Sequence, residues 1–310
     1  MAAGTTFTLN TGAKIPALGF GTWQDADAQE EAVTTALNAG YRHIDTARVY
    51  GTEKAVGAAI RKSHVPRSEI FLTTKLWNTD HRSVDVGTAI DLSLADLGLD
   101  YVDLYLMHWP VAWKPGNDLF PKENGRPVVL GDVDYVDTWR AMEEDVFRVG
   151  KAKAIGISNF SKAETERVIK EGSIKPAVLQ MELHPWLQQA GFTSWLHSHG
   201  IHVTQYSPFG NLNPLYKGAD GKLIDDPVIV DIAKKHGKAG PQVALAWGIA
   251  KGHSVIPKSK TEKRIKDNLA GDFKLEAADV QRIDRIDRKL RFNESSDAFG
   301  YDFFKDLDGK

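Results

Sequence analysis

The sequence predicts an α/β protein built as a (β/α)8 TIM barrel, and three observations lead to that fold class. Eight short apolar runs, each ending in polar residues, alternate with helical patterns along the chain. No linker or low-complexity segment interrupts the alternation. The 310 residues suit one such barrel, which needs about 250, with additions at its ends and in one loop. The pattern favours a parallel barrel over a doubly wound sheet, and a single domain over residues 1–310.

The N-terminal addition is predicted to be a β-hairpin, because Thr6–Leu9 and Lys14–Pro16 flank a turn that contains Gly12. The eight barrel strands are predicted from the apolar runs, which are Ala17–Gly21, Tyr41–Asp45, Ile70–Lys75, Val102–His108, Ala154–Ser158, Val178–Glu182, His202–Tyr206 and Ser254–Pro257. The loop from Pro110 to Asp134 and the C-terminal tail from Phe292 are polar with aromatic residues. We therefore expect both to lie over a site as lids.

Helices are predicted between these runs, where apolar residues recur at helical spacing. They are Asp25–Asn38, Glu53–Lys62, Val84–Leu97, Tyr135–Arg148, Ser161–Ile169, Phe192–His199, Pro241–Lys251 and Thr261–Ala270. Gly40 and Gly98 stand where a helix end favours glycine. Ser161 and Glu164 have the spacing of a capping box, and Pro241 suits a first helical turn.

Composition excludes several classes of function. Acidic and basic residues are mixed along the chain and the formal net charge is −2, so neither nucleic acid nor a membrane surface is an expected partner. The absence of cysteine excludes disulfides, thiolate nucleophiles and cysteine metal sites. No apolar run reaches the roughly 18 residues of a membrane span, and Met1–Thr8 lacks signal-peptide features. We expect a cytoplasmic protein.

Polar residues stand at the predicted strand ends, which meet at one mouth of a barrel. The second strand ends in Asp45 with Tyr50 in the next loop, the third ends in Lys75, and the fourth in His108. A structural ion pair between Asp45 and Lys75 at the rim is one interpretation. Because a buried polar group needs a partner, four such groups on consecutive strands favour a functional site instead.

Six stretches of the sequence carry a resemblance to a known family in their order and spacing. They are Gly19-Phe20-Gly21-Thr22-Trp23, Gly40-Tyr41-Arg42-His43-Ile44-Asp45-Thr46-Ala47, Thr73-Thr74-Lys75-Leu76-Trp77, Leu104-Tyr105-Leu106-Met107-His108-Trp109-Pro110, Gly156-Ile157-Ser158-Asn159-Phe160 and Ile256-Pro257-Lys258-Ser259. The chain resembles the aldo-keto reductases along nearly its whole length. The stretch Leu99–Pro110 and the loop after it look similar to those of fungal members that act as NADP-dependent glycerol dehydrogenases and aldehyde reductases.

The resemblance implies that Asp45, Tyr50, Lys75 and His108 form a catalytic tetrad. Tyr50 would protonate the carbonyl oxygen while a nicotinamide delivers hydride to the carbonyl carbon. The Lys75 ammonium is expected to lower the pKa of Tyr50, and Asp45 to keep Lys75 charged and oriented. His108 would hydrogen-bond the substrate oxygen. The implied reaction is reduction of aldehydes with NADPH, or oxidation of glycerol and other alcohols in reverse.

The resemblance also implies a binding site for the cofactor. Ser158, Asn159 and Gln180 match positions that hold the nicotinamide carboxamide, and Tyr206 matches the ring that stacks on it. Further cofactor positions are the mouth residues Gly21, Thr22, Trp23 and Asp45, and the pyrophosphate loop with Ser207, Phe209 and Asn211.

The preferred cofactor is predicted from residues 258–268. Lys258, Ser259 and Arg264, followed by Asn268, resemble a pocket for the adenosine 2′-phosphate, which Lys and Arg bind by charge-assisted hydrogen bonds. Lys260 replaces the asparagine found in dual-cofactor relatives, so we expect NADP. No Gly-x-Gly-x-x-Gly unit follows the first strand, which argues against a Rossmann domain.

The substrate pocket is expected to be aromatic. Its candidate residues are Trp23, Trp77, His108, Trp109, Trp113 and Phe120. The expected partner is a small carbonyl or alcohol, such as glyceraldehyde, with xylose or a uronate as the alternative substrate. A monomer is the expectation from the family.

Two other functions remain open. A metal-dependent barrel hydrolase would use His43, Asp45, His108, His184 and His202. We expect no metal, because His43 should point away from the neighbours of Asp45 and the first strand has no His-x-His pair. A non-enzymatic family member is the other alternative, and the complete tetrad argues against it.

Overall fold

The computed structural model describes residues 4–213, 215–216 and 219–310. Eight parallel strands form one sheet in the order β12-β11-β10-β9-β6-β5-β4-β3. Their bounds are β3 Phe20–Gly21, β4 His43–Asp45, β5 Phe71–Leu76, β6 Leu104–Met107, β9 Ile155–Ser158, β10 Val178–Glu182, β11 His202–Tyr206 and β12 Ser254–Val255. A parallel bridge between Leu18 and Val255 joins the two edges, and Gly19 N donates to Val255 O at 2.8 Å. The predicted (β/α)8 barrel is therefore confirmed.

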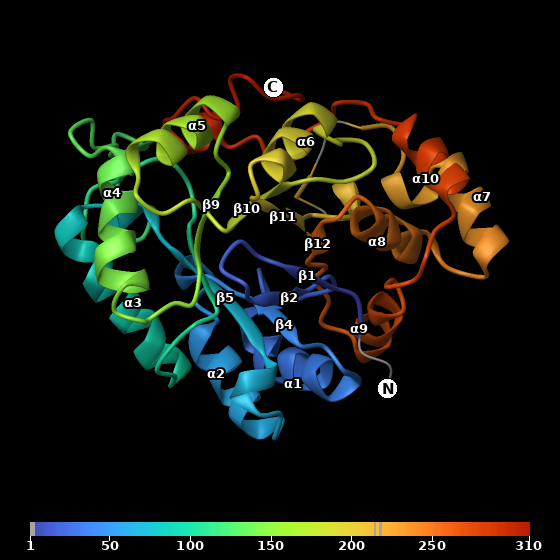
Figure 1. The fold of residues 1–310 in the computed structure, drawn as a ribbon, viewed down its shortest axis with the longest axis horizontal. Helices are drawn as coiled ribbons and strands as arrows, with labels where there is room; N and C mark the ends of the chain where they lie inside the picture. The colour runs from blue at the N-terminus through green and yellow to red at the C-terminus, as the bar shows by residue number, and fades with distance from the viewer. Residues whose placement is uncertain (1–3, 214, 217–218) are drawn as a thin grey trace.

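Helices surround the strands, as Figure 1 shows. Their bounds are α1 Gln29–Ala39, α2 Glu53–Lys62, α3 Ser83–Leu97, α4 Tyr135–Met142, α5 Lys162–Glu171, α6 Ala190–Ser198, α7 Pro227–His236, α8 Gly240–Ala250, α9 Glu262–Leu269, α10 Ala277–Asp284 and α11 Ser296–Phe299. The Ser161–Glu164 capping box and the left-handed C-caps at Gly40 and Gly98 are all present, as predicted.

Several predicted boundaries were wrong, and three helices were missed. The strand predicted over Ala17–Gly21 is only two residues long, because Leu18 joins the sheet through a single bridge. The helix predicted over Tyr135–Arg148 ends at Met142 and continues as a π-helical turn. The missed helices are α7, α10 and α11. The start of α7 carried a readable signal, because Asp226 caps it and Pro227 occupies its first turn.

The hairpin of β1 (Thr6–Thr8) and β2 (Lys14–Pro16) is confirmed, and it closes the N-terminal mouth of the barrel. Leu9 and Ile15 from the hairpin pack with Phe71, Leu104 and other inward side chains of the strands in one cluster. A larger apolar cluster lies between the strands and the helices. Because successive side chains on a strand point to opposite faces, the sequence alternates between these two clusters.

The same alternation points a column of polar residues toward the opposite mouth. Lys75 lies four residues beyond the inward Phe71, and His108 lies four residues beyond the inward Leu104. The buried interior near the hairpin is mostly apolar, although His43 also lies there. Lys75 and His108 stand at the opposite mouth, at the carboxyl ends of the strands.

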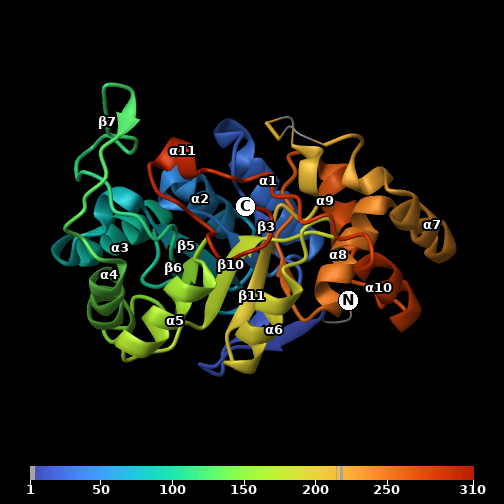
Figure 2. The ribbon, with the colours of Figure 1, turned by 90° about the horizontal axis from the view of Figure 1, so that it is seen from above.

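The long loop after β6 and the C-terminal tail both lie against this mouth. The loop contains a small hairpin that the sequence did not predict, β7 (Lys122–Glu123) with β8 (Arg126–Pro127). Figure 2 shows β7 projecting from the body of the molecule, and β8 contacts α11 of the tail. Residues of both segments line the pocket at this mouth, and their role as lids stays a prediction.

A buried carboxylate anchors the tail. Glu182, at the end of β10, is fully buried and accepts the backbone N–H of Phe292 and of Asn293, each at 2.8 Å. His184 Nε2 lies 3.0 Å from the same carboxylate. The tail is therefore fixed to the end of a barrel strand at its first residues.

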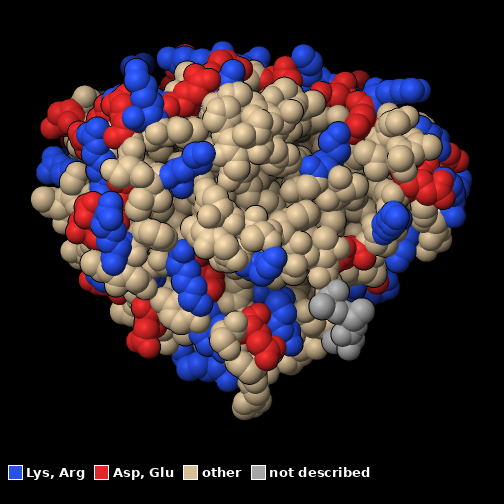
Figure 3. Space-filling model, viewed as in Figure 1, with Lys and Arg blue, Asp and Glu red and all other residues tan. Residues whose placement is uncertain are grey.

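No helix within the described ranges is long and apolar enough to cross a membrane. On the face drawn in Figure 3, uncharged residues fill the centre and the two signs of charge are interspersed around them. That face carries no large patch of a single sign, in keeping with a formal net charge of −2.

We expect Glu182→Gln to destabilise the protein by about 1–3 kcal/mol, because the amide turns an N–H donor toward a backbone N–H that has lost its acceptor. Thermal unfolding followed by circular dichroism measures the change. Glu166→Gln is the matched control, since Glu166 is exposed on α5 and should change stability by less than about 0.5 kcal/mol. Equal midpoints for the two variants would show that the tail is held elsewhere.

Candidate active site

A pocket of about 810 Å³ opens at the carboxyl ends of the barrel strands. Most of the residues predicted to form the site line it. These are Gly21, Thr22, Trp23, Asp45, Tyr50, Trp77, His108, Trp109, Phe120, Ser158, Asn159, Gln180, Tyr206, Ser207, Phe209, Lys258, Ser259 and Arg264. The site is thus an extended cleft, with the predicted tetrad toward one end and the predicted phosphate pocket toward the other.

A buried ion pair lies beneath the cleft. Lys75 Nζ donates to Asp45 Oδ1 at 2.6 Å and to the backbone oxygen of Thr46 at 2.8 Å. Gln180 Nε2 donates to the other oxygen of Asp45 at 2.7 Å. Lys75 is completely buried and Asp45 nearly so, and burial lowers the pKa of Lys75 even though Asp45 opposes that shift. The predicted pairing of Asp45 with Lys75 is confirmed. The hydrogen bond from Gln180 to Asp45 was not predicted.

Tyr50 lies above this pair, in a 3₁₀ turn over Arg48–Tyr50. The Lys75 ammonium is 5.1 Å from the centre of its ring. Burial, with the nearby Asp45 charge, holds the pKa of Tyr50 well above its ordinary value. The raised pKa is opposite to the expectation from Lys75 alone, because burial, the largest cause, and the Asp45 charge both favour the neutral phenol. Tyr50 therefore keeps its proton at neutral pH.

His108 faces Tyr50 across the pocket, with 5.8 Å between their ring centres. Burial, reinforced by the charge of Lys75, holds the pKa of His108 well below its usual range. Its Nδ1 is buried without a partner in the described structure. The imidazole is thus neutral at pH 7 and can serve as a hydrogen-bonding group, with no charge to offer.

Three side chains at the carboxyl ends of β9 and β11 are joined by hydrogen bonds at the predicted nicotinamide end. Tyr206 OH donates to Asn159 Oδ1 at 2.7 Å, and Asn159 Nδ2 donates to Ser158 Oγ at 3.1 Å and to the backbone oxygen of His108 at 3.0 Å. Asn159 has a left-handed backbone with φ 62°, a conformation that asparagine adopts more readily than most residues. This network places amide and hydroxyl groups where a carboxamide needs both donors and acceptors.

The other end of the cleft is cationic. Lys258, Lys260 and Arg264 line it together with Ser259. Asn211 and Asn268 are not among the lining residues. Asn211 instead ties its own loop together, because Nδ2 donates to Gly221 O at 2.7 Å and Oδ1 accepts from Leu223 N.

The expected aromatic wall is present apart from one residue. Trp77, Trp109 and Phe120 line the pocket, and Trp77 lies 5.2 Å from His108 between ring centres. Trp113 does not line it, because its ring is buried behind Trp77 and its Nε1 donates to Phe299 O. Trp113 supports the wall from behind.

Sequence reasoning missed the residues that the tail and the loop after β11 bring to the pocket. Phe299 lines it and packs against Trp109 with 4.8 Å between ring centres. Tyr216 OH donates to Asn293 Oδ1 at 2.7 Å, which joins the loop to the tail. The aromatic residues in a polar tail were a signal for a lid, but nothing in the sequence said which of them turns inward.

The histidines of the metal-hydrolase alternative form no group with metal-ligand spacing in the part of the chain that the structure describes. His43 was expected to point away from the neighbours of Asp45; this was wrong, because residues two apart on a strand share a face. Its Nδ1 contacts Pro16 O at the hairpin end of the barrel, and His202 contacts Ser254. Within the described ranges the one group with ligand spacing is His236, Glu276 and Asp279, and Lys235 bonds both of its carboxylates.

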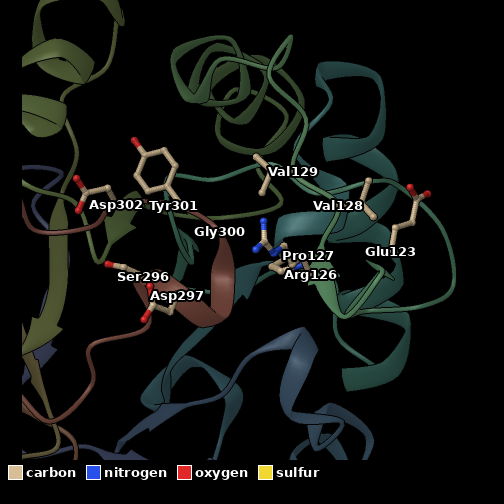
Figure 4. Close-up of a pocket in the computed structure, with 10 residues that line it drawn as sticks. All are labelled: Glu123, Arg126, Pro127, Val128, Val129, Ser296, Asp297, Gly300, Tyr301 and Asp302. Atoms are coloured by element: carbon tan, nitrogen blue, oxygen red, sulfur yellow. The ribbon is translucent and has the colours of Figure 1, made fainter.

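A second hollow of about 910 Å³ lies outside the site, between the β7–β8 hairpin and the tail. Figure 4 shows Arg126 and Val129 on one side of it and Ser296, Asp297 and Tyr301 on the other. None of the tetrad residues lines this hollow. The hollow is therefore distinct from the candidate active site.

The chemistry of the lining groups fits a nicotinamide cofactor. Amide and hydroxyl groups gather beside Tyr50 and His108, where the reacting ring would lie, and three cations gather at the far end, where a phosphate would lie. At the mouth, a Cβ on Gly21 would come 3.1 Å from Ile256 O, so the wall there is close-packed backbone.

Comparisons with known proteins show what the chain as a whole is similar to. Residues 17–288 match the model of the aldo/keto reductase family. An uncharacterized oxidoreductase of Schizosaccharomyces pombe is 46% identical over 293 residues, which cover 94% of this chain and 91% of the relative. Aldo-keto reductase family 1 member A1 of Xenopus tropicalis is 44% identical over 293 residues, with 92% and 89% covered. The mouse protein of that name is 40% identical over 292 residues, with 92% and 90% covered.

We expect Tyr50 to stay protonated well above the ordinary tyrosine pKa of about 10. Phenolate absorbance measured during an alkaline titration should therefore show no difference between the native protein and Tyr50→Phe up to about pH 10. A difference with a midpoint at or below about pH 8 would mean that Lys75 outweighs burial and Asp45.

Proposed function

The chain belongs to the aldo/keto reductase family, and on that premise we propose that it reduces aldehydes to alcohols with NADPH, with Tyr50 as the proton donor. The observation that carries the proposal is the buried Asp45–Lys75 pair directly beneath Tyr50, with neutral His108 facing the phenol across the pocket. As a member of this family the protein is an oxidoreductase that acts on carbonyl groups.

The cofactor supplies hydride to the carbonyl carbon when it is bound. The residues of this chain bind and protonate the carbonyl oxygen. Tyr50 donates a hydrogen bond to the carbonyl oxygen, which polarises the carbonyl, and it releases its proton as negative charge builds on that oxygen. An alkoxide is more basic than a phenolate, so a phenol of raised pKa still protonates it.

Lys75 and His108 act at opposite sides of this proton transfer. Once Tyr50 has given up its proton, the Lys75 ammonium lies near the phenolate and stabilises it, while Asp45 and Thr46 O hold the ammonium in place. Neutral His108 can donate a hydrogen bond to the same carbonyl oxygen and fix its position. The aromatic wall excludes water, which strengthens each of these interactions.

NADP is the cofactor that the cationic end of the cleft supports. Lys258, Lys260 and Arg264 line a region where NAD would present hydroxyl groups and NADP a phosphate. The electrostatic attraction of three cations for a phosphate dianion is far stronger than their attraction for neutral hydroxyl groups. Ser259 adds a hydroxyl that can donate to a phosphate oxygen.

Glyceraldehyde and other small or sugar aldehydes are the proposed substrates, with oxidation of glycerol and similar alcohols as the reverse reaction. The relatives named aldo-keto reductase family 1 member A1 support reduction of a carbonyl. A xylose or uronate reductase is the second candidate. Its support is the polar edge that Asn293 and Ser295 give to an otherwise aromatic pocket. A single domain over residues 1–310, a monomer and a cytoplasmic location stay predictions of the sequence.

Purified protein should oxidise NADPH when glyceraldehyde is added, and Tyr50→Phe should slow this by about 10²–10⁴-fold while NADPH still binds, because only the proton donor is lost. Absorbance of NADPH measures turnover, and quenching of tryptophan fluorescence measures binding. Undiminished turnover in the variant would remove Tyr50 from the mechanism. Higher kcat/KM with xylose or glucuronate than with glyceraldehyde would favour the second candidate.

Arg264→Ala should weaken the binding of NADPH by about tenfold or more and change NADH binding by less than about twofold, because the lost hydrogen bonds reach only the 2′-phosphate. Fluorescence titration with each nucleotide measures both. Lys263→Ala is the matched control, since Lys263 is exposed on the same helix and pairs with Asp267. Equal losses for NADPH and NADH would place Arg264 away from the phosphate.

A further inference from the structure

The loop after β3 has an unusual backbone. Gln24 and Asp25 are consecutive residues with left-handed conformations, with φ 68° and 52°. Two such residues in a row, neither of them glycine, store strain that their surroundings must offset. Each makes a contact far along the chain: Gln24 Oε1 accepts from Asn213 Nδ2 at 3.1 Å, and Asp25 reaches two lysines that follow β12.

Asp25 bonds those lysines with separate oxygens. Oδ2 accepts from Lys258 Nζ, and Oδ1 accepts from Lys260 Nζ at 2.8 Å. The hydrogen bonds to Lys258 and Lys260 lower the pKa of Asp25 to about 2, so the carboxylate is charged throughout the neutral range. Two oxygens of a phosphate could accept hydrogen bonds from the same two lysines in the same arrangement.

Both lysines belong to the cationic end of the cleft, and Asp25 lines the same cleft. Arg264, the third cation there, has no ion pair in the part of the chain that the structure describes. The carboxylate of Asp25 therefore cancels one of the three positive charges at this end of the cleft. It does so by bonding the two lysines that would face an incoming phosphate.

We propose that Asp25 competes with the 2′-phosphate of NADPH for Lys258 and Lys260, and thereby sets how tightly and how selectively the cofactor binds. The proposal rests on the proposed function, because it takes NADP as the cofactor. The phosphate dianion must break at least one carboxylate–lysine bond as it enters, or bind beside a like charge. Asp25 accordingly lowers the affinity for NADPH. It has almost no effect on the affinity for NADH, because NADH brings no phosphate to this end of the cleft.

The contacts of Asp25 with the two lysines are exposed to water, unlike the buried Asp45–Lys75 pair, so a phosphate can replace the carboxylate. The side chains of Lys258, Lys260 and Asp25 are 24%, 56% and 31% exposed, so water reaches all three. Exposed pairs are weak and screened by salt, and a ligand can replace one partner without leaving a buried charge behind. When the cofactor leaves, Asp25 can return to the lysines and help displace the phosphate.

Asp25→Asn tests the proposal, since asparagine keeps the shape and tolerates a left-handed backbone. We expect NADPH and adenosine 2′,5′-bisphosphate to bind roughly three- to tenfold more tightly, and NADH to change by less than about twofold. The NADPH affinity should also fall more steeply with salt, because one more unpaired cation attracts the phosphate. Calorimetry with adenosine 2′,5′-bisphosphate reads binding without turnover.

Asp27→Asn is the matched control. It removes the same charge two residues away, from an exposed side chain that has no ion pair among the described residues, and should leave every affinity unchanged. Unchanged or weaker NADPH binding in Asp25→Asn, with a native protein that prefers NADPH, would overturn this inference and leave the proposed function standing. A native protein that binds NADH as tightly as NADPH would overturn the proposed cofactor and this inference with it.

Discussion

The buried ion pair of Asp45 with Lys75 is the interaction on which the site and much of the fold depend. Removing both charges from water costs several kcal/mol for each ion, and attraction offsets that only when the remaining hydrogen-bonding groups are also satisfied. Here Thr46 O and Gln180 complete the set. The partners come from β4, β5 and β10, so the pair is stable only when the barrel has closed with these strands in register.

The pair explains why so much could be predicted from the sequence. A charge that lies inside a barrel must stand at an inward position near a strand end, and that requirement fixes both the face and the direction of its strand. Val178–Glu182 and His202–Tyr206 were predicted to the residue. Prediction failed where the periodic signal was short, as in β3, or where a helix came after the barrel was complete, as in α10.

What could not be predicted depends on contacts between distant parts of the chain. Gln180 was recognised as a cofactor residue, yet its bond to Asp45 joins residues 135 apart in sequence. Phe299 enters the pocket because Glu182 fixes the start of the tail, and no local pattern records that anchor. The pKa of Tyr50 was predicted in the wrong direction for a related reason. Considering only the nearby ammonium leaves out burial, which raises the pKa of the phenol most, and the Asp45 charge, which raises it further.

The cleft therefore carries two pairings of aspartate with lysine, and burial decides what each can do. At the chemical end, Asp45 and Lys75 are sealed from water, so no ligand can displace either partner without isolating a buried charge. That pair is a fixed part of the machinery. At the phosphate end, Asp25, Lys258 and Lys260 remain in contact with water, so a stronger anion can take the place of the carboxylate. Aspartate and lysine thus form a permanent ion pair at the chemical end of the cleft and a replaceable one at the phosphate end.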